Sequence, residues 1–223
     1  MNGMIDMLTD TANLVLQRLQ EKGSHLLGKA AINSPRAVGD TVQTFLSSDE
    51  GLQACLPTGV LDKFESGFER RSMEDMAFFA KGLYFAVDCK THNLETAFNM
   101  PNLISVQRLA KFYENDTNVF CILIVEYTTD GGQINYKRCV FRPIESFAWD
   151  CLTFGALGWG QIQIANSNNL KFTEHIDRRA WMLELCDRID EFYCEEIEKI
   201  GTRRQWFDKV RYRWEQREET IIY

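Results

Sequence analysis

The residues best suited to chemistry in this sequence are two aspartates and a lysine around an apolar hairpin. Asp88 and Lys90 flank Cys89 in the triplet DCK, and Asp75 precedes the apolar run before it. Side chains at positions i and i+2 of a strand share a face, so Asp88 and Lys90 point the same way and Cys89 points into the core. Two carboxylates can hold a divalent cation, and an ammonium can stabilise an attacked phosphate. One chemistry that such a set of groups could perform is magnesium-assisted phosphodiester hydrolysis.

The element that must bring these groups together is a hairpin centred on Lys81 and Gly82. The aromatic and aliphatic runs MAFFA and LYFAV flank this turn, which predicts two antiparallel strands. A turn centred between these two residues places Asp75 opposite Asp88. A DxK triplet also occurs by chance, where Asp and Lys merely mark the exposed end of a strand. Both interpretations stay open on this ground alone.

The rest of the chain predicts an α/β protein with a central mixed sheet, helices beside it and a helical carboxyl end. Residues 47–70 are expected to be irregular, with a short helix. Asn102 is expected to cap a helix, and Gly201 to separate the last two helices. The predicted helices cover residues 1–23, 41–48, 102–116, 174–200 and 202–218. The predicted strands cover residues 76–80, 83–90, 118–129, 134–144 and 160–166.

Composition bounds the class of protein. The chain has 223 residues, of which 45% are hydrophobic, enough for one domain over 1–223 with its core over about 36–170 and its terminal helices over about 173–218. Seven cysteines without CxxC or zinc spacing indicate free thiols in a reducing cytoplasm. No run is apolar enough for a membrane span or an export signal, so we expect a soluble, unexported protein. A net charge of −7 opposes nucleic-acid binding, although the placement of the basic residues matters more than their sum.

Three blocks of sequence carry a resemblance to a known family. Glu74–Phe79, Tyr84–Asn93 and Met100–Ala110 together resemble the core of type II restriction endonucleases of the PD-(D/E)XK superfamily, in the branch of HincII and EcoRV. The similarity covers about residues 72–127, and a weaker echo covers residues 160–185. The resemblance implies a restriction-endonuclease-like core for the predicted α/β fold.

The same resemblance implies an activity and its residues. Asp75 and Asp88 would bind Mg²⁺, and Lys90 would position or help deprotonate the attacking water, so that cleavage leaves a 5′-phosphate. Such enzymes are usually homodimers that cut palindromic double-stranded DNA within bacterial or archaeal restriction–modification systems. A further acidic residue on an early helix often supports the metal, and Asp40 is the candidate here. Its ordinary alternative is a helix N-cap.

The resemblance also places DNA contacts in the loop before Pro101 and on the strand around residue 162. Asparagine can hydrogen-bond to the edge of an adenine base, but in loops its side chain also stabilises turns by bonding to the backbone. The two glutamines share one strand face, which would line either a DNA cleft or a solvated strand edge. The candidate DNA-contacting residues are His92, Asn93, Asn99, Asn102, Gln161 and Gln163.

Two other functions stay open at this point. A repair or junction-resolving nuclease would share the same core, and random nicking or a preference for branched DNA would identify it. A catalytically silent DNA-binding module would keep Asp75 and Asp88 far apart, or would turn Lys90 into the core.

Overall fold

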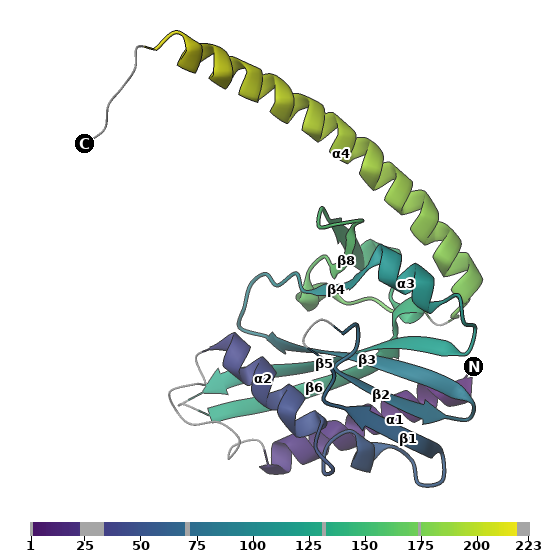
Figure 1. Cartoon of the computed structure of the whole chain (residues 1–223). Helices are drawn as coiled ribbons and strands as arrows, with labels where there is room; N and C mark the ends of the chain where they lie inside the picture. Colours follow the sequence, from purple (N-terminus) through teal and green to yellow (C-terminus); the bar gives the residue numbers. More distant parts are fainter. Residues whose placement is uncertain (1, 23–33, 70–71, 131–132, 174, 218–223) are drawn as a thin grey trace. The chain divides into compact units, whose positions relative to one another are not determined.

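The chain divides into two compact units, Met1–Ile176 and Asp177–Tyr223. The computed structural model describes residues 2–22, 34–69, 72–130, 133–173 and 175–217. The first unit contains both β-sheets and three α-helices, and the second contains one long helix (Figure 1). No helix in these described ranges is long and apolar enough to cross a membrane.

A five-stranded mixed sheet forms the centre of the first unit. The strands β3 and β5 pair in parallel, and the other neighbours pair antiparallel. Nine successive residues of β5, from Val119 to Tyr127, are buried, as the continuous apolar run predicts for a strand covered on both faces. The predicted α/β class with a central mixed sheet is therefore confirmed. In spatial order the strands are β1 (Leu61–Ser66), β2 (Met76–Ala80), β3 (Leu83–Asn93), β5 (Asn118–Asp130) and β6 (Gln133–Pro143).

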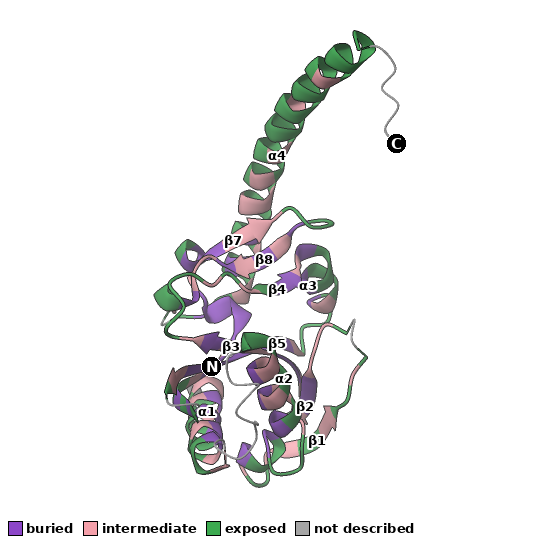
Figure 2. Ribbon diagram, turned by 90° about the vertical axis from the view of Figure 1, so that its left-hand side faces the viewer, coloured by how far each residue is buried: buried purple, intermediate pink, exposed green. Residues whose placement is uncertain are grey.

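Two helices, α1 (Asn2–Lys22) and α2 (Pro35–Leu46), cover one face of this sheet. Their apolar sides share a core cluster with alternate residues of the strands, among them Phe85 and Val87, and Figure 2 shows the buried residues gathered there. Burying each large apolar side chain contributes about 1.5–3 kcal/mol. The hydrophobic core cluster includes residues of α1 such as Leu8 and Leu19, which precede the core range predicted over about 36–170.

A smaller antiparallel sheet consists of β4 (Asn102–Ser105), β8 (Gln161–Ile164) and β7 (Leu152–Gly155). The predicted strand around residue 162 is confirmed, but the helix predicted over 102–116 is wrong at its start. Residues 102–105 form β4, and the short helix α3 (Val106–Phe112) begins only after Ser105. Backbone pairing of β4 with β8 outweighs the local helical spacing, because tertiary context overrides a weak propensity.

The stretch 47–70, predicted to be irregular, contains a 3₁₀ turn (Gln53–Cys55) and the edge strand β1. The burial of β1 does not alternate along its length, so it carries no strand signal of its own, and only its pairing with β2 defines it. The strand predicted over residues 134–144 is confirmed as β6, which pairs with β5. The two glycines of the predicted DGGQ turn lie outside the described residues.

The second unit has one helix where two were predicted. Helix α4 (Arg178–Glu215) runs 38 residues and passes through Gly201 without a break. Asp177 caps its start by accepting a hydrogen bond from the backbone N–H of Ala180 at 3.1 Å. A glycine costs a helix interior only about 1 kcal/mol. Ion pairs along the helix, such as Lys199 with Glu196 at 3.0 Å, help to offset this cost.

Candidate active site

The β2–β3 hairpin has the register that the sequence predicts. Met76 pairs with Val87, and the strands reverse at Lys81–Gly82, where both residues have positive φ (51° and 75°). One residue further out, the backbone N–H of Asp75 donates to the carbonyl of Val87 at 2.9 Å. The strand pairing ends at Met76–Val87, and the contacts of Asp75 with Val87 and Cys89 place it beside Asp88 at the end of the hairpin.

The Asp75 carboxylate is held at both of its oxygens. Its Oδ2 accepts from the backbone N–H of Cys89 at 2.7 Å, and its Oδ1 accepts from Gln43 Nε2 at 2.7 Å. Gln43 lies on α2, which approaches β3 closely at Gly39: a Cβ there would lie 3.3 Å from Thr91 Oγ1. Gln43 and the end of the hairpin together orient this carboxylate.

Asp88 and Lys90 form a buried ion pair on β3. Asp88 is only 7% exposed, and its Oδ1 accepts from Lys90 Nζ at 2.7 Å. Its other oxygen, Oδ2, is buried with no hydrogen-bond partner among the described residues. Cys89 packs against the core cluster on the opposite side of the strand, as alternation predicts. Asp88 and Lys90 therefore share one face, and Lys90 does not turn into the core.

The electrostatics of this group are unusual for an aspartate. Burial raises the pKa of Asp88 to about 7; the charge and hydrogen bond of Lys90 oppose this rise, and the charge of Asp75 adds to it. Burial alone would lower the pKa of Lys90, but the charge and hydrogen bond of Asp88, together with the charge of Asp75, leave the pKa raised. A carboxyl that changes protonation near neutral pH is typical of functional sites.

Two clefts of about 550 Å³ each adjoin these residues, and Ser72 borders both. Asp75 lines the first cleft with Gln43, while Asp88 and Lys90 line the second. The three predicted catalytic residues are therefore divided between two neighbouring clefts. The second cleft is also lined by residues of β4, α3 and the β7–β8 loop, among them Asn102, Ser105, Gln107, Arg108, Leu157, Trp159 and Gln161.

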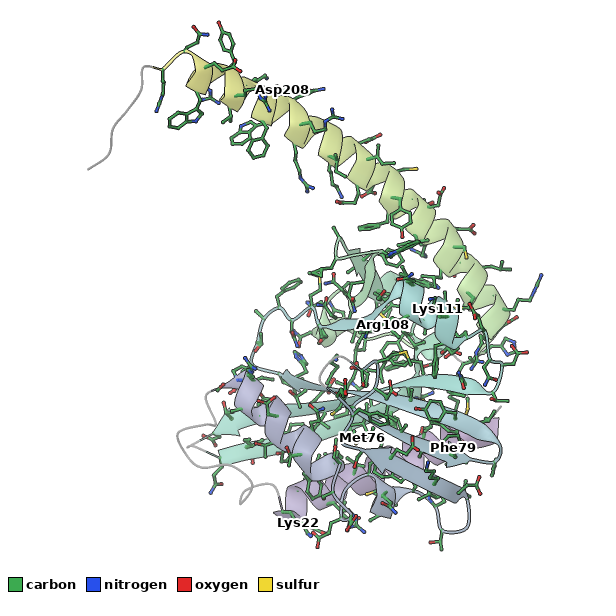
Figure 3. The ribbon with its side chains drawn as sticks, viewed as in Figure 1. Lys22, Met76, Phe79, Arg108, Lys111 and Asp208 are labelled. Carbon is green, nitrogen blue, oxygen red and sulfur yellow. The ribbon has the colours of Figure 1, made fainter. Side chains whose placement is uncertain are left out.

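Three residues of the second cleft that were not predicted from the sequence have properties that suit a binding site. Arg108 supplies a basic group from α3, where Figure 3 labels it beside Lys111. Leu157 and Trp159 are 70% and 63% exposed on the β7–β8 loop. In sequence Arg108 belongs to the polar side of an ordinary helix. Only the folded position of α3 reveals it.

Asp40 lines the same cleft as Asp75 but forms no cluster of three carboxylates with Asp75 and Asp88. The described residues contain no group of three or more histidine, cysteine, aspartate or glutamate side chains placed to hold a metal ion. The Asp40 side chain is 73% exposed, lies 4.0 Å from Arg36, and borders only the first cleft. It is no helix cap either, because Ser34 caps α2. The residue of α2 that reaches Asp75 is Gln43, one turn further along.

His92, Asn93 and Asn99 support the loop after β3. His92 is only 1% exposed, and its ring nitrogens contact Asn168 Oδ1 at 2.9 Å and Asn99 Nδ2 at 3.3 Å. A base contact by His92 would require it to leave both partners, so in this structure it positions the loop. Asn93 accepts a hydrogen bond from the backbone N–H of Glu95 at 2.9 Å. This contact stabilises a turn, which was the alternative to a role in DNA binding.

Asn102, Gln161 and Gln163 lie together on the smaller sheet. Gln163 Nε2 donates to Asn102 Oδ1 at 2.5 Å across the β4–β8 pair. The amide of Gln161 lies 3.1 and 3.2 Å from the backbone nitrogens of Ile104 and Ser105, so its oxygen faces these donors. Asn102 is exposed and the glutamines are half-buried, and Asn102 and Gln161 line the second cleft.

The donor set fits Mg²⁺ held by two carboxylates. Mg²⁺ commonly takes one or two carboxylates and fills its other positions with water and phosphate oxygens. Asp75 and Asp88 supply this number, and the unpartnered Oδ2 of Asp88 is the acceptor that a cation would satisfy. An all-protein cage of the calcium or zinc kind has too few ligands among the described residues.

No protein-family model matches this chain, and no curated protein resembles it at a significant level. The geometry of the site and the physical properties of its residues therefore carry the functional argument.

Gln43→Ala is expected to weaken Mg²⁺ binding about tenfold, since groups that orient a metal ligand typically contribute this much. Gln43→Glu, which places a third carboxylate beside Asp75, is expected to tighten binding instead. Isothermal titration calorimetry with Mg²⁺ measures both. Thr44→Ala, an exposed change on the same helix, is the control. Equal Mg²⁺ affinities for all these proteins would show that Gln43 does not contribute to metal binding.

His92→Ala is expected to lower the free energy of unfolding by about 2–3 kcal/mol, because it leaves a cavity and unpaired groups on Asn99 and Asn168. Urea unfolding measures the change. The exposed His175→Ala is the matched control. A loss no larger than that of the control would show that the loop does not depend on this histidine.

Proposed function

We propose that this protein is a Mg²⁺-dependent endonuclease of the type II restriction class, which hydrolyses phosphodiester bonds of double-stranded DNA at a short palindromic sequence and leaves 5′-phosphates. The observation that carries the proposal is the position of Asp75, Asp88 and Lys90 at the end of one hairpin, where Asp88 and Lys90 line one cleft and Asp75 lines its neighbour. Burial of an aspartate with an unpartnered oxygen is costly, and an aspartate that merely ended a strand could avoid this cost by being exposed.

Each group has a role that follows from its surroundings. A bound Mg²⁺ would supply Lewis-acid stabilisation of the phosphate and a more acidic water. Asp88 and Asp75 would hold it, with Asp75 oriented by Gln43 and by the backbone of Cys89. Lys90 keeps its ammonium beside Asp88, where it can offset charge on the attacked phosphate and orient the water.

The surroundings of the site also suit a nucleic acid. The net charge of −7 disfavours DNA in general, but the second cleft itself combines Lys90 and Arg108 with the amides of Asn102 and Gln161. Cations suit backbone phosphates, and amides suit base edges. We therefore assign phosphate contacts to Lys90 and Arg108 and base contacts to Asn102 and Gln161.

The proposal extends to the setting that the family resemblance implies. Cutting both strands of a palindrome calls for two copies of the site, which a homodimer would supply. The protein would act in the cytoplasm of a bacterium or archaeon, beside a methyltransferase that protects the host sequence.

Incubation of the purified protein with a sequenced plasmid and Mg²⁺ tests the proposal. We expect discrete fragments whose ends, read by run-off sequencing, share one short sequence and ligate as 5′-phosphates. Asp75→Ala is expected to abolish the fragments, and EDTA to do the same. Random nicking, or a preference for branched junctions, would indicate a repair or junction-resolving nuclease. Sequence-specific DNA binding without cleavage in Mg²⁺ or Mn²⁺ would indicate a silent binding module.

A further inference from the structure

Helix α4 carries a row of large apolar side chains that are exposed to solvent. Figure 2 shows the helix exposed over most of its length. From Leu183 onward, alternate steps of three and four residues define what we call the α4 stripe. Its large apolar members are between 36% and 68% exposed: Leu183, Tyr193, Ile197, Ile200, Phe207 and Trp214.

The spacing of the α4 stripe is that of a coiled coil. Steps of three and four repeat every seven residues, and a stripe with this period stays in contact with a partner helix when the two supercoil. From Leu183 to Trp214 the stripe runs about 47 Å at 1.5 Å per residue. Monomeric proteins seldom leave so long an apolar surface open to water.

The charges of α4 divide into two halves at the middle of the stripe. Residues 184–198 contain seven carboxylates and one arginine, whereas residues 199–213 contain six basic residues and one aspartate. A parallel copy would place acidic half against acidic half. An antiparallel copy places the acidic half of each helix against the basic half of the other, and this arrangement is attractive.

The charged members of the stripe select the same direction. Asp190, Arg204 and Arg211 occupy stripe positions, and in a parallel, in-register pair each would meet its own copy. In an antiparallel pair centred between residues 198 and 199, Arg204 instead lies opposite Tyr193. A guanidinium over an aromatic ring is a favourable contact.

We propose that α4 pairs with α4 of a second copy of this chain as an antiparallel two-stranded coiled coil, centred between Glu198 and Lys199. Ile197 of each copy then faces Ile200 of the other, and Leu183 faces Trp214. This interface involves the second unit alone and stands independently of the nuclease proposal.

Sedimentation equilibrium of the full chain tests the pairing. We expect a mass near twice 25.9 kDa. The double variant Ile197→Asp, Ile200→Asp is expected to sediment as a monomer. Trp206→Asp with Tyr212→Asp changes two equally exposed apolar residues outside the stripe and adds the same charge, and this control is expected to remain a dimer. A monomeric wild-type chain, or equal dissociation of both variants, would overturn the proposal.

Disulfide trapping tests the direction. In a chain whose exposed cysteines are replaced (Cys186→Ser, Cys194→Ser), Leu183→Cys together with Trp214→Cys is expected to give a covalent dimer on oxidation. Each single cysteine variant is expected to give none, because antiparallel pairing separates it from its twin by about 47 Å. Covalent dimers from the single variants would show parallel pairing and reject the antiparallel arrangement.

Discussion

Asp88→Asn is expected to abolish DNA cleavage, with a loss of at least about 10³-fold, while the protein remains folded. The amide keeps the size of the side chain but cannot hold Mg²⁺ as a carboxylate does. Cleavage of a plasmid measures the loss, and far-UV circular dichroism confirms the fold. Asp62→Asn, at an exposed position of β1, is the matched control and is expected to cut normally.

The same variant is expected to change how stability depends on pH. In the folded wild type the pKa of Asp88 is about 7, against 3.8 for an ordinary aspartate. Between these values the folded chain keeps a proton that the unfolded chain releases, so wild-type stability falls as pH rises from about 4 to about 7. Asp88→Asn has no proton to release and escapes this loss. The variant therefore gains on the wild type across this range, by at most about 4 kcal/mol.

Urea unfolding at about pH 5 and about pH 8, with and without Mg²⁺, measures this difference. Mg²⁺ is expected to stabilise the wild type at the higher pH, because it binds only the ionised carboxyl, and to leave Asp88→Asn unchanged. If the free energies of unfolding of the two proteins changed with pH in parallel, the pKa of Asp88 would not be raised as its burial indicates. Equal stabilisation of both by Mg²⁺ would place the metal elsewhere.

The hairpin that carries the site could be predicted because its signals are local. Turn residues at Lys81–Gly82 fix the reversal, and strand alternation then fixes which side chains share a face. The expected opposition of Asp75 and Asp88 follows from these two facts, and the observed pairing up to Met76–Val87 has the predicted register. Burial of β5 on both faces was equally readable, since only a fully covered strand tolerates an unbroken apolar run.

The parts that could not be predicted depend on partners distant in sequence. Gln43 reaches Asp75 across 32 residues, and nothing in the pattern of α2 distinguishes it from Asp40. The strands β1 and β4 have weak patterns and exist through their pairing with β2 and β8. His92 was a candidate DNA contact because the family resemblance places base contacts in the loop before Pro101. Its burial depends on Asn168, 76 residues away.

Errors in predicting where a helix or strand begins moved the site residues less than errors in predicting side-chain contacts. Exchanging a predicted helix start for β4 left Asn102 close to Gln163 and at the cleft. The continuity of α4 through Gly201, by contrast, creates a stripe that two separate helices would have divided. Local propensity did not predict this continuity. The destabilisation of the helix by a single glycine is smaller than the stabilisation that its ion pairs and its cap provide.

Lys90→Met is expected to lower the cleavage rate at neutral pH by about 10²–10⁴-fold, through two separable effects. The first is the loss of the ammonium beside the phosphate. The second acts through Asp88, whose pKa Lys90 lowers by its charge and its hydrogen bond. Without Lys90 that pKa rises further, so less of Asp88 is ionised at neutral pH and Mg²⁺ binds more weakly.

The pH dependence of Mg²⁺ affinity separates the two effects. In Lys90→Met the affinity is expected to recover as pH rises above neutrality, since deprotonation of Asp88 restores the ligand, whereas the cleavage rate recovers only in part because the ammonium is still missing. Lys111→Met removes an exposed lysine from α3 and is expected to leave both profiles unchanged. If Lys90→Met left the affinity profile where it lies in the wild type, Lys90 would act on the phosphate alone, and the buried ion pair would have no part in setting the charge of the metal ligand.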